Sequence, residues 1–396
     1  MQNHNMIYLD HHATTPLDPR VREAMQPYFG EKFGNPHSSD HAVGWEASKS
    51  IEVAADAVAA MIGADADEII FTSGATEANN MALLGVAGHA VGGARNRILL
   101  GATEHKCVLE VGRVLERRFG LKVKRIPVDS EGRLDLNFLA AELDEDVLLV
   151  SVMAVNNEIG TLQDISEIAR MTSQVGGLLH CDAAQAPCAI EMSMFADWAD
   201  LLSLSAHKMY GPMGVGALFI RRELQSRIEP LVHGGGQQNG LRSGTLPTAL
   251  CVGFGCAAKL ASNEHSTIER EILACRRDFL LERLRTLPYP NWINGPNNPK
   301  YRHPGNINIG FKGVVAADLL GRVQPNLAAA TGSACTSGIP EPSHVLRAIG
   351  LSDDEAGASI RLSVGRYSTE DELAEAAHIL GAALEKTFSE TSSIFA

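Results

Sequence analysis

Short apolar runs rich in β-forming residues alternate along this chain with longer stretches of helical pattern. Strands are predicted at residues 68–73, 98–101, 147–154, 177–182, 201–205 and 215–220, and helical stretches such as 75–88 and 165–174 fall between several of them. Strands that alternate with helices build parallel sheets that are covered on both faces. The pattern therefore predicts an α/β fold with a mostly parallel sheet.

The length of the chain predicts more than one hydrophobic core. It has 396 residues, and a single core usually stops growing near ~250–300 residues. A long helical pattern from about 248 to 284 is followed by a second α/β segment with strands at 307–311 and 359–363, and the stretch 288–305 reads as a surface connection. We predict a large domain over residues 16–262 and a small domain over residues 263–396, joined by an N-terminal arm of residues 1–15.

The net charge and the cysteine content of the chain argue against several kinds of binding partner and against a metal site. The net charge of −13 argues against direct binding to nucleic acid or to an anionic membrane, because both need a basic face. No apolar run approaches the ~20 residues that span a bilayer, and the N-terminus does not resemble a signal peptide, so a cytoplasmic location is expected. Seven cysteines without a C-x-x-C spacing predict free thiols and no metal site.

A lysine follows one of the predicted strands directly. The tetrapeptide from Ser205 to Lys208 overlaps the end of strand 201–205, and ligands in open α/β sheets collect beyond the carboxyl ends of strands. A lysine in such a place can form a Schiff base with a carbonyl cofactor. A surface lysine after a strand is the simpler interpretation of the tetrapeptide alone.

Three further polar residues follow two other predicted strands. Asp182 ends the strand 177–182, and an acidic side chain is what the pyridine nitrogen of pyridoxal phosphate (PLP) needs as a partner. Gln185 could then reach the phenolic oxygen of the cofactor. His105 follows the strand 98–101, where an imidazole could stack on the ring and shuttle protons. Ordinary helix caps are the simpler alternatives for Asp182 and His105.

The segment from Thr72 to Glu77 joins an apolar strand to a helix and resembles a phosphate-binding turn. Gly74 allows a close approach of the backbone, and the first helical N–H groups favour an anion. An ordinary helix start is the alternative. Neither G-x-x-x-x-G-K-[ST] nor a strand followed by G-x-G-x-x-G occurs, so the sequence does not favour a nucleoside triphosphate or a dinucleotide.

Two candidates lie near the C-terminus. Cys335 stands among small residues that are followed by Pro340 and Pro342, a composition typical of a loop, and a thiol on a loop is a candidate nucleophile. Arg361 lies inside the strand 359–363 and could bind a carboxylate through two parallel hydrogen bonds. An incidental exposed cysteine and a surface ion pair are the simpler alternatives.

The order of these motifs resembles one family, the cysteine desulfurases of the NifS/IscS-like branch, which are class-V aminotransferase-type, fold-type I PLP enzymes. The resemblance extends from residue 8 to residue 366, and the strings that carry it are YLDHHATTPLDPRV, FTSGATEANN, TEHKCVL, VNNEIGTLQD, HCDAAQAP, SLSAHKMYGPMGVGAL, RSGTLP, GSACTSG and SIRLSVGR. It implies a large PLP-binding domain and a small domain that carries the catalytic cysteine.

The resemblance also implies roles for single residues. Lys208 would be the Schiff-base lysine and proton shuttle, Cys335 would take the sulfur, and Asn156 and Arg361 would bind the substrate carboxylate. A threonine that matches Thr245 reaches the phosphate from the second subunit in this family, which implies a homodimer. The remaining cofactor-binding residues would be Ala75, Thr76, His105, Asp182, Gln185, Ser205 and His207.

The implied reaction converts L-cysteine into L-alanine and leaves the sulfur on Cys335 as a persulfide. Sulfur-acceptor proteins of iron–sulfur cluster assembly, tRNA thiolation or related pathways would then receive it. The chain ends soon after its last helical pattern, where longer members carry an extension that docks an iron–sulfur scaffold, so that partner is not implied. The alternatives are an aminotransferase or selenocysteine lyase of the same fold, and a sulfur-relay scaffold without the chemistry. Cys335 argues against an aminotransferase, and Lys208, Asp182 and His105 argue against a scaffold.

Overall fold

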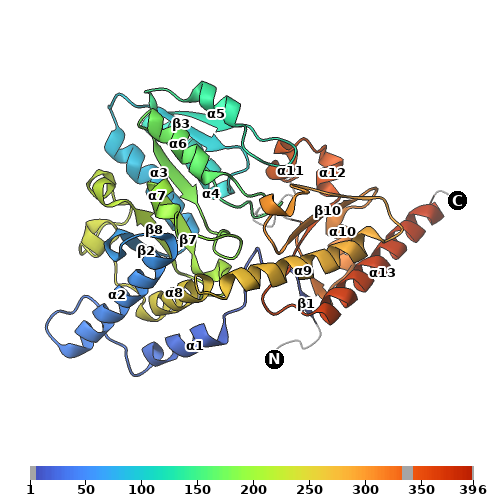
Figure 1. The fold of residues 1–396 in the computed structure, drawn as a ribbon, viewed down its shortest axis with the longest axis horizontal. Helices are drawn as coiled ribbons and strands as arrows, with labels where there is room; N and C mark the ends of the chain where they lie inside the picture. The colour runs from blue at the N-terminus through green and yellow to red at the C-terminus, as the bar shows by residue number, and fades with distance from the viewer. Residues whose placement is uncertain (1–5, 332–341, 395–396) are drawn as a thin grey trace.

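The structure is a computed structural model that describes residues 6–331 and 342–394. Its largest sheet has seven strands, and Figure 1 shows helices on both sides of it. β8 is antiparallel to both of its neighbours, whereas the pairs from β7 to β4 are all parallel. This confirms the predicted α/β fold with a mostly parallel sheet. The strand order is β2 (Ile69–Thr72), β8 (Gly216–Ile220), β7 (Leu201–Ser205), β6 (Leu178–Asp182), β5 (Val147–Ser151), β3 (Arg97–Gly101) and β4 (Lys122–Ile126).

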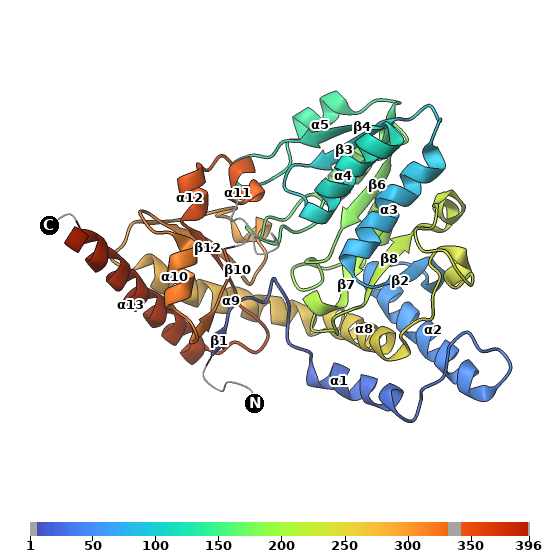
Figure 2. The same cartoon turned by 180° about the vertical axis from the view of Figure 1, so that it is seen from behind.

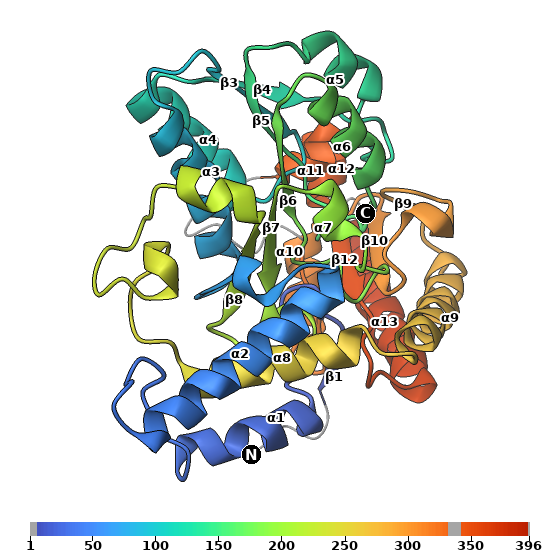
Figure 3. The ribbon, with the colours of Figure 1, turned by 60° about the vertical axis from the view of Figure 1, so that its left-hand side comes forward.

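Helices cover both faces of this sheet. Inner strands such as β5 and β7 are therefore buried over their whole length. On one face, α3 (Ala75–Ala90) and α4 (Lys106–Phe119) lie side by side, as Figure 2 shows from behind. The other face is covered by α2 (Ala42–Ile62), α6 (Ile165–Gln174) and α8 (Thr248–Ala261). α2 and α8 run next to each other (Figure 3). The sheet thus has one hydrophobic core on each face.

A second, smaller sheet stands apart from the first. It is antiparallel, in the order β12 (Ser359–Ser363), β10 (Asn306–Phe311) and β9 (Asn291–Ile293). The helices α9 (Ser266–Arg285) and α13 (Glu370–Ile394) pack against it, and their buried leucines share a core with Ile309 and Phe311. Separate cores for the two sheets agree with a two-domain chain, while the boundaries 16–262 and 263–396 remain a prediction.

The N-terminal arm contacts both parts of the molecule. β1 (Ile7–Tyr8) pairs in parallel with β11 (Leu327–Ala328), and the next residue, Leu9, is buried in the core of the small sheet. A few residues later the Thr15 hydroxyl donates to the backbone oxygen of His207 at 3.0 Å. The arm therefore passes from the small sheet to the segment that carries Lys208.

Shorter helices occupy the connections. They are α1 (Pro19–Met25), α5 (Leu136–Glu142), α7 (Phe195–Trp198), α10 (Ala316–Arg322), α11 (His344–Ala348) and α12 (Asp353–Gly357). Among the described helices, none combines the length and the apolar character that crossing a bilayer requires.

The structure corrects two predictions about the chain between the sheets. The helical pattern over 248–284 forms two helices, α8 and α9, separated by residues 262–265. The prediction that residues 288–305 form only a surface connection is wrong. This stretch contains β9, and its residues Asn294, Arg302 and His303 are buried. Its polar side chains are buried because they bond one another and the backbone: the Arg302 guanidinium, for example, donates to the backbone oxygens of Asn294 and Pro296.

Candidate active site

Five strands of the large sheet end at the same edge, and residues of the predicted site follow or end each of them. β2 is antiparallel to β8, and β8 is antiparallel to β7, so β2 runs in the direction of β7 and of the other parallel strands. The carboxyl ends of these strands are where ligands bind in open α/β sheets. Gly74 follows β2, His105 follows β3, Asn157 follows β5, Asp182 ends β6 and Ser205 ends β7.

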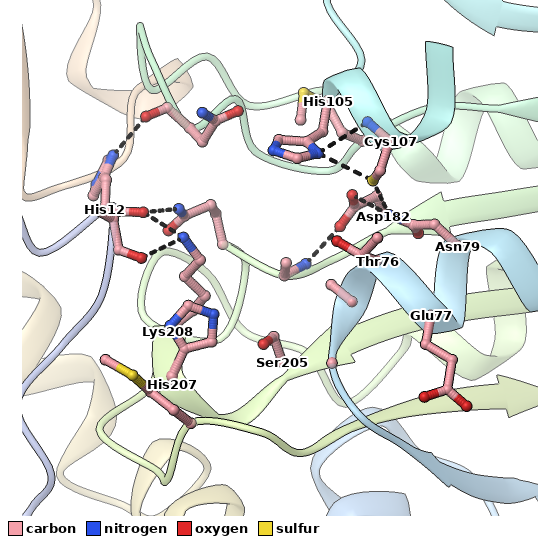
Figure 4. Close-up of a pocket in the computed structure, with 18 of the residues that line it drawn as sticks. His12, Thr76, Glu77, Asn79, His105, Cys107, Asp182, Ser205, His207 and Lys208 are labelled. Carbon is pink, nitrogen blue, oxygen red and sulfur yellow. Dashed lines mark hydrogen bonds between the residues drawn. The ribbon is translucent and has the colours of Figure 1, made fainter. Parts of the chain in front are cut away.

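These strand ends surround a cavity of about 490 Å³. Figure 4 shows that its wall combines residues that are far apart in the sequence. Nine of the residues predicted from the sequence line it: Ala75, Thr76, His105, Asp182, Gln185, Ser205, His207, Lys208 and Arg361.

Lys208 reaches into this cavity from the short helical turn that follows β7. Its Nζ donates to the backbone oxygen of His12 at 2.6 Å and to that of Ala13 at 2.8 Å. The Gln185 amide donates to the same His12 oxygen at 2.8 Å. The N-terminal arm therefore orients two of the predicted cofactor-binding side chains through backbone carbonyl groups.

Asp182 is a buried carboxylate with two donors. Its Oδ1 accepts the Ala184 N–H at 3.0 Å, and its Oδ2 accepts the Asn79 amide at 2.8 Å. A second buried carboxyl, Glu104, lies nearby, and burial together with Asp182 holds the pKa of Glu104 well above its usual range. The shift favours the neutral form of the Glu104 carboxyl, because two like charges so close together disfavour each other.

His105 is the N-cap of α4, as the simpler interpretation predicted, and it is also a part of the cavity wall. Its role at a cofactor ring stays a prediction. Its Nδ1 accepts the backbone N–H of Cys107 at 3.2 Å and lies 3.0 Å from the Cys107 sulfur. Because Nδ1 accepts a backbone N–H, it cannot carry a proton, and we assign the neutral ring proton to Nε2. The ring then offers an N–H from Nε2.

The other end of the cavity fits a phosphate. Gly74 is the N-cap of α3, its φ of 149° favours glycine, and the first-turn N–H groups of α3 have no side-chain cap among the described residues. Gly216 lies so close to this turn that a Cβ atom on it would stand 2.6 Å from the Gly74 Cα. The Ser205 hydroxyl is buried without a hydrogen-bond partner in the described part of the chain. Open N–H groups and an unsatisfied hydroxyl are what a phosphate would satisfy.

His207 lines the same end of the cavity, where its uncharged imidazole can donate or accept a hydrogen bond. Burial, and then the charge of Lys208, lower the pKa of His207 to about 4, so the ring is uncharged at neutral pH. Its Nδ1 lies 3.1 Å from the Thr14 hydroxyl. The imidazole can therefore form a hydrogen bond to a phosphate, but it adds no positive charge.

Arg361 brings a buried positive charge to the cavity from β12 of the small sheet. It forms an ion pair with Asp10 at 2.6 Å and donates to the backbone oxygen of Asn157 at 2.9 Å. Its Nε has no hydrogen-bond partner within the described residues. A substrate carboxylate would satisfy this donor, and it would share the guanidinium with Asp10.

Two of the predicted residues that the structure describes, Asn156 and Thr245, do not line the cavity. Asn156 is buried behind it, where its amide donates to the Thr103 backbone oxygen at 3.1 Å and its Oδ1 accepts two backbone N–H groups. Thr245 is exposed and lines a separate surface pocket with Phe29 and Phe33. Cys335 lies outside the described residues. The roles predicted for these three residues are not tested by the geometry.

Among the residues without a predicted role that line the cavity, four have side chains that can form hydrogen bonds. They are His12, Asn79, Cys107 and Asn157. All four stand inside the strings that carried the family resemblance, and Asn79 follows Ala75 by four positions on one face of α3. Spacing from a known site residue could therefore have indicated Asn79.

The chain is similar to known proteins over nearly its whole length. The family Aminotransferase class-V matches residues 7–375. The cysteine desulfurase IscS of Rickettsia typhi is 44% identical over 384 residues, which cover 96% of this chain and 91% of that protein. A solved NifS-like protein superposes with a TM-score of 0.88 at 35% identity, covering 96% of this chain and 99% of that one. SspA, solved in complex with cysteine, superposes with a TM-score of 0.79 at 33% identity, over 92% of this chain and 100% of that one.

Proposed function

The chain belongs to the class-V aminotransferase family and is a PLP-dependent cysteine desulfurase, and on this premise we propose how its residues divide the work. The relatives support L-cysteine as the substrate, since SspA was solved with cysteine. The proposed products are L-alanine and a persulfide on Cys335. The observation that supports this most directly is that Lys208, Asp182 and His105 reach one cavity from three different strand ends.

The residues of the cavity fit PLP from one end to the other. Ala75, Thr76, Ser205 and His207 would hold the phosphate, and Asp182 would pair with the ring nitrogen. When bound, PLP supplies an electron sink that makes the bonds at the substrate Cα reactive. Lys208 would hold the cofactor covalently and carry a proton at Nζ, and His105 would stack on the ring and offer the proton on Nε2.

The substrate side of the cavity would use Arg361 and Cys335. The unsatisfied Nε of Arg361 supports a role in binding the substrate carboxylate, with Asn156 as the second predicted contact. Cys335 would attack the substrate sulfur as a thiolate, so that the S–C bond to the substrate Cβ breaks and a new S–S bond forms. The substrate carbon chain would keep the electron pair of the broken bond and take up a proton to become alanine.

The test of this function is product analysis. The purified protein reconstituted with PLP should convert L-cysteine into equal amounts of alanine and sulfide when a thiol reductant releases the persulfide. Omission of PLP from the cofactor-free protein is the control. A protein that forms a 2-oxo acid and no sulfide would be an aminotransferase, and the desulfurase assignment would be wrong.

We further propose that the active unit is a homodimer. Thr245 is exposed, and the nearby Phe29 and Phe33 are 65% and 76% exposed, which is unusual for such large apolar side chains. A second subunit covering this surface would bury both rings and bring Thr245 towards the phosphate of its partner.

We also propose that the persulfide sulfur is delivered to acceptor proteins and that the protein is cytoplasmic.

Thr245→Ala should weaken PLP binding without unfolding the protein. The loss of one hydrogen bond to a charged phosphate corresponds to about 1.5–3 kcal/mol, so the Kd for PLP should rise roughly ten- to hundredfold. Titration of the cofactor-free protein measures this Kd, and light scattering measures the mass. Thr286→Ala, an exposed threonine at the end of α9, is the matched control. A fully active monomer would contradict the proposal.

A further inference from the structure

Asn79 connects the two residues that are expected to flank the cofactor ring. It lies on α3, one turn after Ala75, and its side chain is completely buried. One amide nitrogen donates to Asp182 Oδ2 at 2.8 Å and to the Cys107 sulfur at 3.3 Å. The Cys107 sulfur in turn lies 3.0 Å from His105 Nδ1 (Figure 4).

The hydrogen-bond directions in this chain follow from the chemistry of its members. An ionised carboxylate can only accept, so Asn79 must present its amide nitrogen to Asp182. His105 Nδ1 accepts the Cys107 backbone N–H and therefore carries no proton of its own. In the contact between Nδ1 and the Cys107 sulfur, only the thiol has a proton to donate. The Cys107 sulfur is then left with lone pairs, and the second N–H of Asn79 points to them. One side chain thereby supplies a donor to each branch.

A purely structural role does not explain Asn79. Its Oδ1 is buried and has no hydrogen-bond partner within the described residues. A buried amide with an unsatisfied oxygen is costly, so packing alone does not favour an asparagine at this position. The position is therefore better explained by what the amide nitrogen holds than by packing.

We propose that Asn79 is a positioning residue that sets Asp182 and His105 together, through its own amide and through the Cys107 thiol. This inference rests on the proposed function, because it takes these two residues to contact the cofactor. Asn79 shares α3 with the predicted phosphate-binding turn, so the same helix would align the phosphate, the carboxylate partner of the ring nitrogen and the stacking imidazole.

Two substitutions at Asn79 separate its amide from its volume. Asn79→Leu keeps the size and removes both donors. Asn79→Asp keeps the shape and places a second carboxylate beside Asp182, where the two like charges disfavour each other. We expect the Kd for PLP to rise about tenfold for Asn79→Leu, the scale of one charge-assisted hydrogen bond, and further for Asn79→Asp. Asn79→Leu leaves the buried Asp182 Oδ2 without this donor, so the melting temperature should fall, but by no more than about a few degrees.

Cys107→Ala tests the branch towards His105 alone. It leaves the bond between Asn79 and Asp182 in place, so the Kd for PLP should stay within about twofold of the wild-type value. The ring nitrogen signals of His105, followed by NMR in the cofactor-free protein labelled with ¹⁵N-histidine, should shift in Cys107→Ala and in Asn79→Leu. Asn294→Leu is the matched control, because Asn294 is another buried asparagine whose amide donates to two acceptors, here in the small sheet.

The NMR measurement does not require cofactor or turnover, so it separates this inference from the proposed function. A wild-type protein that does not bind PLP would overturn the proposed function and this inference with it. Normal PLP binding by the wild type together with unchanged Kd values and His105 signals in both Asn79 variants would overturn the inference alone. The same result would follow if Asn294→Leu weakened PLP binding as much as Asn79→Leu does.

Discussion

The Cys335→Ala protein should bind PLP and L-cysteine but release almost no alanine. The proposed mechanism separates two tasks: Lys208 acts at the substrate Cα, and Cys335 takes the sulfur. Cofactor binding and the first spectral change on adding L-cysteine do not use the thiol, so both should persist. Replacement of one small residue by another should also leave the fold intact. Turnover should fall by roughly 10³-fold or more, as expected when a nucleophile of the reaction is removed.

Mass spectrometry provides the second readout for Cys335. The wild-type peptide that contains residue 335 should gain one sulfur atom after reaction with L-cysteine, and the Cys335→Ala peptide should not. Cys275, which is exposed on α9 and does not line the cavity, is the matched control, and Cys275→Ala should keep most of the activity. Desulfuration by Cys335→Ala at near the wild-type rate would reject the persulfide mechanism and favour a general PLP lyase.

Lys208→Ala should abolish turnover and the covalent link to PLP. Lys208 combines covalent attachment with proton transfer, so its loss should reduce turnover by roughly 10³-fold or more. PLP can still bind to this variant through the groups at Gly74, Asp182 and Ser205, so the protein should retain the cofactor more weakly. Absorbance shows whether PLP remains, and denaturation shows whether it was covalently attached.

Chemical reduction identifies the lysine directly. Borohydride should fix PLP to the wild-type peptide that contains Lys208 and to no peptide of the Lys208→Ala protein. Lys259→Ala, a lysine in the last turn of α8, is the matched control and should be labelled like the wild type. A label on another lysine of the wild-type protein would reject the assignment of Lys208.

The strand ends were the part of the site that could be predicted best. Asp182, Ser205 and Lys208 follow apolar runs closely, and the geometry of parallel sheets brings the ends of such runs together wherever they lie in the sequence. The strand β4 was missed, because its residues Lys122, Lys124 and Arg125 are charged and exposed. Charged side chains are typical of an edge strand, which needs no apolar pattern.

Other parts of the site had no readable signal in the sequence. The His12 carbonyl binds Lys208 and Gln185, but every residue has a backbone carbonyl, so its side chain does not reveal this role. Asn156 and its neighbour Asn157 look equivalent in the sequence, yet only Asn157 lines the cavity. Which of two adjacent residues faces a ligand depends on the local backbone of the loop, and residue type alone does not determine this.

The course of the N-terminal arm has a consequence for the order in which the protein can assemble during synthesis. The arm supplies the backbone oxygens that orient Lys208 and Gln185, and it is held by β11, by Arg361 and by the Ser363 hydroxyl, which accepts the His12 N–H at 2.9 Å. The residues of the arm therefore find these partners only after the ribosome has made the chain as far as Ser363. Because domains otherwise fold as they emerge, the large sheet can form early, but a nascent chain that is cut short before Ser363 cannot complete the wall around Lys208.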